Sequence, residues 1–161
     1  MVKKRSSLFR ALGHQEPPVS VWVNNVEFKL YEVFKHDSWA ATASYNAEDG
    51  SGLVCKFNRT APIGLIPMKW LGRWLASREN WFYDTLSDVE LVAEKAVVFD
   101  ETGHSPKNIS AHTFIDGNPF MLKSEVSDDF FDNLIALINV LHERGIAYVC
   151  LLYTSPSPRD S

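Results

Sequence analysis

Apolar and polar residues alternate over residues 19–34, on both sides of the pair Asn24-Asn25. This alternation is typical of half-buried β-strands, and Asn tolerates the positive φ that a two-residue hairpin turn requires. Two antiparallel strands joined at this pair are therefore predicted. A second hairpin is predicted from residues 41–45 and 53–57, which flank the turn-rich segment 48–52. The first third of the chain is expected to form an antiparallel sheet.

The spacing of apolar residues changes to three and four after Pro67, which is typical of an amphipathic helix that begins at or just after this residue. Residues 89–99 and 108–114 are apolar enough for two more strands. A second helix is predicted to start at the capping segment Ser127-Asp128-Asp129 and to stop at Gly145. Its buried side is expected to carry Phe130, Phe131, Leu134, Ile135, Ile138 and Leu141. The order of strands, helix, strands and helix predicts the α+β fold class.

Three tryptophans share one face of the first predicted helix: Trp70, Trp74 and Trp81. A helix that lies on a membrane surface also carries such a face. Apart from Arg78, only Lys69 and Arg73 supply positive charge around it, too few for an anionic surface. Packing of the three indole rings in the core is therefore expected.

One charge pair is predicted when the helical period of the first helix and the strand alternation of residues 53–57 are considered together. On the helical wheel a polar stripe contains Arg73, Ser77, Asn80 and Asp84. Glu79 falls on the opposite side, and a buried carboxylate needs a cation. In the strand 53–57, Leu53, Cys55 and Phe57 share one face, whereas Val54 and Lys56 share the other. A helix packed on that second face would pair Glu79 with Lys56. Two alternatives to this ion pair are open. The Lys56 side chain could extend past the sheet edge to water, and Glu79 could lie at the exposed border of the helix contact.

Composition describes an ordinary globular chain of one domain, with 161 residues of which 45% are apolar and 22% charged. The net charge of −4 gives no basic field for nucleic acid or an anionic membrane. No apolar run of about 18 residues occurs, so neither a transmembrane segment nor a secretory leader is predicted, and a cytoplasmic protein is expected. Cys55, Cys150 and the five scattered histidines lack the spacing of a disulfide framework or a metal site.

An antiparallel sheet with a lysine on an inner strand, followed by a helix with a glutamate, resembles the small lobe of protein kinases. Val54-Cys55-Lys56-Phe57 stands where such kinases carry Val-Ala-Ile-Lys. The resemblance implies that Lys56 holds the α- and β-phosphates of ATP and that Glu79 fixes Lys56. It also implies Mg²⁺, whose ligands would come from the large lobe.

Longer segments resemble a small bacterial branch of serine/threonine-kinase-like proteins related to RIO and lipopolysaccharide-core kinases. They include Trp70-Leu71-Gly72-Arg73-Trp74-Leu75 and His142-Glu143-Arg144-Gly145-Ile146-Ala147-Tyr148-Val149. The resemblance covers about residues 10–149. It implies an N-terminal extension over residues 1–18, a small lobe and hinge over 19–117, and the first helix of an incomplete large lobe over 118–149.

Further ATP-binding residues follow from the same resemblance. The turn from His36 to Ala41 stands in place of a glycine-rich phosphate loop but contains no glycine. Its implied contacts are His36, Asp37, Ser38, Ala40 and Ala41, where small alanines let backbone N–H groups approach phosphate. Val54 follows as a neighbour of Lys56. His112 and Phe114 resemble the hinge that hydrogen-bonds adenine, although an ordinary strand leading into a turn explains them equally well.

Residues 150–161 resemble the translation of a sequencing adapter used with a transposase, with a native Pro/Ser tail as the alternative. In the kinase-like family the segment ending at Val149 continues into the aspartate of the catalytic loop, and Cys150 occupies that position here. The chain is therefore expected to be truncated before its catalytic loop and to be inactive alone.

The sequence thus predicts the ATP-binding half of an ATP-dependent phosphotransferase. Its acceptor is left open among a protein, a lipid-linked sugar and a small molecule. A non-catalytic kinase-like regulatory or binding module, in which Lys56 and Glu79 are structural, is the first alternative. An unrelated small α+β interaction domain is the second.

Overall fold

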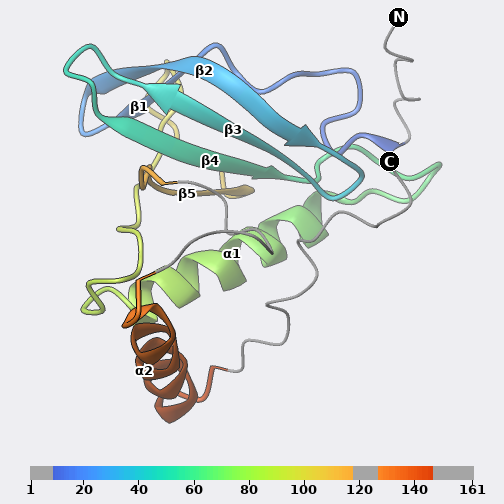
Figure 1. Ribbon diagram of the computed structural model, residues 1–161. Helices are drawn as coiled ribbons and strands as arrows, with labels where there is room; N and C mark the ends of the chain where they lie inside the picture. Colours follow the sequence, from blue (N-terminus) through green and yellow to red (C-terminus); the bar gives the residue numbers. More distant parts are fainter. Residues whose placement is uncertain (1–8, 118–126, 147–161) are drawn as a thin grey trace, which may run out of the picture. The chain divides into compact units, whose positions relative to one another are not determined.

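The computed structural model describes residues 9–117 and 127–146, so the expected foreign tail and Cys150 lie outside the described residues. The chain divides into two compact units, residues 1–115 and 116–161. The first contains a five-stranded antiparallel sheet and one helix, and the second contains one helix (Figure 1). The predicted α+β class is confirmed at this level.

The sheet follows the order of the chain, and every strand is antiparallel to its neighbours. Its strands are β1 (Ser20–Val23), β2 (Val26–His36), β3 (Ala40–Asn46), β4 (Gly52–Asn58) and β5 (Ile109–Thr113). Between β1 and β2, Asn24 and Asn25 have φ values of 50° and 65°, the paired positive angles of a tight hairpin turn. Both predicted hairpins are confirmed, as is the strand expected within residues 108–114.

The two faces of the sheet have different roles, because residues that pair across strands lie on the same face. Cys55 of β4 pairs with Ala43 and Ala111, and all three are buried in the main hydrophobic core. Burial raises the pKa of the Cys55 thiol to about 12. Lys56 pairs with Thr42 and Ser110 on the opposite face.

Residues 89–99 do not form the predicted strand. The Ala96 N–H donates to the carbonyl of Ala111 on β5 at 2.9 Å, whereas Phe99 exchanges hydrogen bonds of 2.8 and 3.0 Å with Trp22 on β1. Since β1 and β5 are the two edges of the sheet, the segment pairs with β5 only at residues 94–96 and then crosses to β1 at Phe99. Val98 is buried in the core during this crossing.

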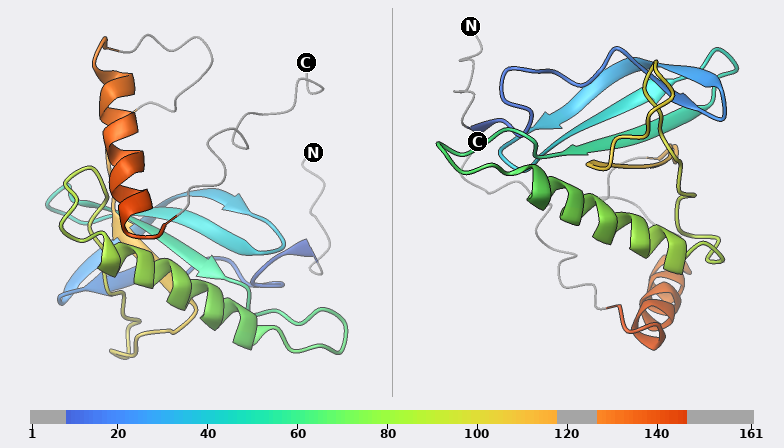
Figure 2. Two further views of the ribbon diagram at one scale, coloured as in Figure 1. Left: turned by 90° about the horizontal axis from the view of Figure 1, so that it is seen from below. Right: turned by 180° about the vertical axis from the view of Figure 1, so that it is seen from behind.

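The helix α1 (Lys69–Thr85) covers the Lys56 face of the sheet and contacts β4 and β5 (Figures 1 and 2). It starts two residues after Pro67, close to the predicted start. The expected burial of the tryptophans is wrong, because Trp70, Trp74 and Trp81 are 63%, 50% and 54% exposed.

The buried residues of α1 are small instead, namely Gly72 and Ala76. A Cβ atom on Gly72 would lie 2.1 Å from the backbone carbonyl oxygen of Arg59. The helix therefore packs too closely for large side chains at its contact line, and the indole rings point elsewhere.

The second unit contains α2 (Phe130–Glu143). Asp129 occupies the N-cap position, as the capping segment predicted, but makes no side-chain cap hydrogen bond. The predicted stop is confirmed, since Gly145 has a φ of 71° and the N–H of Ile146 donates to the carbonyl of Leu141 at 2.8 Å. Of the six apolar residues expected on a buried side, Leu141 alone is buried in the described part of the chain.

Candidate functional site

Lys56 and Glu79 form the ion pair that the sequence predicts. The Nζ atom of Lys56 lies 3.1 Å from Oε1 and 3.0 Å from Oε2 of Glu79. The hydroxyl of Ser110 also donates to Oε2, at 2.7 Å. Glu79 of α1 is therefore bound to both β4 and β5.

The next helix residue strengthens this attachment. Asn80 was expected in the polar stripe away from the sheet, but its Nδ2 donates to the carbonyl of Ile109 on β5 at 3.2 Å. Two consecutive polar residues reach the sheet because Gly72 and Ala76 bring the helix axis close to it. The remaining stripe residues Arg73, Ser77 and Asp84 are exposed, as predicted.

A cavity of about 740 Å³ opens beside the ion pair, between the sheet and α1. Its lining includes Ala40, Lys56 and Asn58 from the sheet and Leu75, Arg78 and Glu79 from the helix. The Lys56 side chain is 40% exposed and that of Glu79 is 27% exposed. The ammonium group is thus open to a ligand on one side while it is held by Glu79 on the other.

Val54 and His112 pair across β4 and β5 on the same face as Lys56. The His112 ring lies 5.4 Å from the Tyr83 ring of α1, centre to centre. Burial, and then the nearby charge of Glu79, raises the pKa of Tyr83 to about 12. The structure therefore brings these two sequence-predicted residues to the Lys56 face.

His36 and Ala41 lie on the opposite face. They pair with each other, and Ala41 belongs to the hydrophobic core. The His36 ring contacts the N-terminal segment, with Nδ1 2.6 Å from Arg10 Nη2 and Nε2 accepting the Leu12 N–H at 3.3 Å. The sheet separates both residues from Lys56. Residues 9–18, expected to be an extension, include Leu12, which packs against the hydrophobic core of the sheet.

Asp37 and Ser38 form the turn between β2 and β3. Asp37 Oδ1 accepts hydrogen bonds from the N–H groups of Trp39 at 2.8 Å and Ala40 at 3.0 Å. Burial alone would raise the pKa of Asp37, but the hydrogen bonds from Lys35 and from these amides lower it below its ordinary value. The backbone donors expected to meet phosphate are therefore bonded within the turn, so that expectation requires Asp37 to release them.

The expected hinge is also internally bonded. The N–H of Phe114 donates to the carbonyl of Gly52, and the N–H of Thr113 donates to that of Glu94, both at 2.9 Å. Phe114 itself is 44% exposed. An adenine contact at these two amides would replace existing hydrogen bonds.

Two buried polar residues were not predicted from the sequence. Asn58 is the last residue of β4, and Arg59 follows it directly. Arg59 is fully buried, and its guanidinium donates to the carbonyls of Ser38, Ala61 and Pro62. Asn58 is 2% exposed and lines the cavity. The sequence offers one signal for them, their adjacent positions at the end of an apolar strand.

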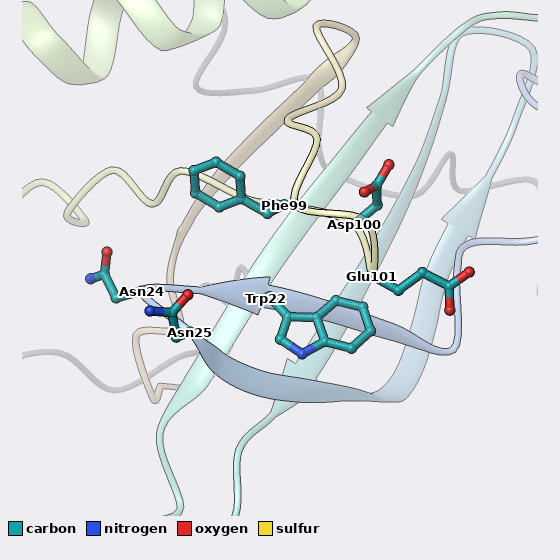
Figure 3. Close-up of a pocket in the computed structure, with 7 residues that line it drawn as sticks. Trp22, Asn24, Asn25, Phe99, Asp100 and Glu101 are labelled. Carbon is teal, nitrogen blue, oxygen red and sulfur yellow. The ribbon is translucent and has the colours of Figure 1, made fainter.

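A second cavity of about 480 Å³ lies at the β1–β2 turn, beside Trp22 and Asn25 (Figure 3). Asp100 and Glu101 line it, and no cation among the described residues does, so an anionic ligand would be repelled. It contains none of the expected site residues.

Within residues 9–117 and 127–146, no three His, Cys, Asp or Glu side chains gather as metal ligands would. Neither helix has the length and apolar character needed to cross a bilayer, over the residues described.

Comparison with known proteins adds no family assignment to this geometry. No protein-family model, curated protein or solved structure matches the chain. The kinase resemblance therefore depends on the residues quoted above and on their arrangement.

Proposed function

We propose that the chain binds ATP as the nucleotide-binding half of a protein-kinase-like phosphotransferase. The observation that supports this most is the ion pair of 3.0 Å between Lys56 on an inner strand and Glu79 on the packed helix. In protein kinases a strand lysine holds the α- and β-phosphates, and it requires a helix glutamate to fix it.

The local chemistry supports an anionic ligand. An ammonium group has three donors. Glu79 occupies only part of the Lys56 ammonium group, and the Lys56 side chain is 40% exposed. Arg78 also lines the cavity, with its guanidinium 4.9 Å from the centre of the Trp74 ring. Two cations thus face one carboxylate, which is itself bound by Lys56 and Ser110.

The order of residues along β4 supports a nucleotide that lies along the strand. Val54 faces the expected hinge residue His112 at one end, Lys56 is central, and Asn58 pairs with Ala40 at the other end. The base would lie toward His112 and the phosphates toward Ala40. Mg²⁺ enters this proposal with ATP. No described residue is assigned as catalytic base or metal ligand, and the acceptor stays among the three classes named above.

A non-catalytic kinase-like regulatory or binding module is the second candidate. It is favoured by the amides of Ala40 and Phe114, which are already hydrogen-bonded within the protein. In that case Lys56 and Glu79 only fasten α1 to the sheet, and ATP does not bind.

Calorimetric titration with Mg²⁺ and ATP separates the two candidates. Lys56→Met is expected to lower ATP affinity by about tenfold or more, because a charge-assisted contact to phosphate is lost. Lys95→Met is the matched control, since Lys95 forms an ion pair of 2.7 Å with Asp84 of the same helix outside the cavity. Absence of ATP binding by the folded chain would support the non-catalytic module. Equal ATP binding by both variants would contradict the role of Lys56 in holding the phosphates.

A further inference from the structure

Asn58 lines the Lys56 cavity and carries a buried amide donor that has no partner among the described residues. The Asn58 side chain is 2% exposed, and its Nδ2 makes no hydrogen bond within the described part of the chain. The side chain of Asn108 donates to the backbone carbonyl of Asn58, so it does not bond to the side-chain amide of Asn58. Buried donors are nearly always bonded in proteins. An unbonded one that lines a cavity therefore indicates a ligand that accepts a hydrogen bond.

The charges around Asn58 specify an anionic acceptor. Among the described residues that line the cavity, Lys56 and Arg78 are cationic and Glu79 is the one carboxylate. Lys56 and Ser110 already occupy that carboxylate. The charged part of the lining therefore presents donors and positive charge, beside an apolar part made of Trp39, Leu71, Leu75 and Phe82.

The position of Asn58 along β4 specifies which part of a nucleotide it would meet. Residues two apart on one strand face are separated by about 7 Å. Val54, Lys56 and Asn58 therefore form a row on one face, with His112 beside the first and Ala40 beside the last. With the α- and β-phosphates at Lys56, the terminal phosphate is the group that extends to Asn58.

We propose that Asn58 Nδ2 donates to the terminal phosphate and makes the site selective for a nucleoside triphosphate over a diphosphate. This inference depends on the proposed ATP binding at Lys56. It adds a specificity-determining residue that the resemblance does not supply.

The test is titration of the full chain with ATP, ADP and tripolyphosphate. Asn58→Leu removes the donor with a side chain branched at the same atom, and Asn58→Asp replaces it with an acceptor at nearly the same volume. Both are expected to lower the ratio of ATP to ADP affinity by about tenfold, the effect of one hydrogen bond to a charged group. Asn46→Leu, an exposed asparagine of β3, is the control that retains the ratio. Thermal unfolding of each variant verifies that it is folded, and Asn58→Leu is expected to fold because it removes an unpaired donor.

The outcomes separate this inference from the proposed function. Nucleotide binding that depends on Lys56, together with an unchanged ATP-to-ADP ratio in both Asn58 variants, overturns the inference and leaves the proposed function intact. Absence of binding of either nucleotide by the parent chain overturns both. Tripolyphosphate binding that weakens in Asn58→Leu, without any nucleotide binding, would retain a phosphate site at Asn58 and reject the nucleotide.

Discussion

The buried guanidinium of Arg59 donates a hydrogen bond of 2.6 Å to the carbonyl oxygen of Ser38. The backbone N–H of Arg59 donates to the carbonyl of Trp39 at 2.9 Å. The same guanidinium also donates to the carbonyls of Ala61 and Pro62, in the loop before α1. One residue thus connects the β2–β3 turn to the loop that leads into the helix. The turn borders the Lys56 cavity through Trp39.

Arg59→Met is expected to lower the free energy of unfolding by about 3 kcal/mol or more, because it leaves several buried carbonyls without a donor. Arg59→Lys should recover only part of this loss, since an ammonium group lacks the planar fork of a guanidinium. Urea unfolding measures both. The control is Arg73→Met at an exposed position of α1, where a change within about 0.5 kcal/mol is expected. Equal stability of the two methionine variants would contradict the structural role of Arg59.

Gly72→Ala should destabilise the chain even though alanine favours a helix over glycine. The new Cβ would lie 2.1 Å from the carbonyl oxygen of Arg59, which is backbone and cannot rotate away. We expect a loss of about 1–3 kcal/mol in the free energy of unfolding, the cost of overpacking. Gly117→Ala, where a Cβ meets no atom within 4 Å, is the control. A stabilised Gly72→Ala variant would mean that α1 lies farther from the sheet.

Glu79→Gln is expected to cost about 1–2 kcal/mol in stability, a moderate effect for a pair with partly exposed side chains. The Lys56 side chain is 40% exposed, so its ammonium group can be hydrated, while Ser110 retains an amide oxygen as acceptor. Asp84→Asn breaks the surface pair with Lys95 and should cost less than about 1 kcal/mol. Chemical denaturation gives both values. A loss above about 3 kcal/mol for Glu79→Gln would show that water does not reach Lys56.

His36 should make the chain less stable as the pH falls below about 6.5. Burial, and then the cation of Arg10, lowers the pKa of His36, while the carboxylates of Glu16 and Asp37 act in the opposite direction. The unfolded chain therefore takes up the proton first, and the free energy of unfolding falls between the ordinary pKa and the lowered one.

His36→Gln is expected to flatten this pH dependence, whereas His104→Gln, at an exposed position, should retain it. Thermal unfolding at pH 5.5 and pH 7.5 measures the difference. An identical pH slope in the parent chain and in His36→Gln would contradict the assignment to His36.

Local periodicity was sufficient for the hairpins and for the Lys56–Glu79 pair. A period of two placed Lys56 on the helix side of β4, and the helical wheel placed Glu79 on the sheet side of α1. The wheel failed for Trp70, Trp74 and Trp81 because it ranks residues by hydrophobicity. The contact with the sheet requires small residues, Gly72 and Ala76, and a helical wheel does not take the size of side chains into account.

Other features depend on partners that are distant in the chain. Residues 89–99 have the composition of a strand, but their hydrogen bonds go to β5 at Glu94 and Ala96 and to β1 at Phe99. Arg59 binds carbonyl oxygens, which every residue carries, so no residue type in the sequence marks its partners. The unpaired amide of Asn58 is visible only once the cavity around it is defined.

Cys55 gives the chain an internal measure of how often its sheet opens. The thiol is fully buried, with a pKa raised to about 12, and alkylating reagents react with the exposed thiolate. With Cys150 replaced by serine, Cys55 is the one thiol left in the sequence. Its β4 position is paired with Ala43 on β3 and with Ala111 on β5. The alkylation rate of the folded chain therefore measures the separation of β4 from its neighbours.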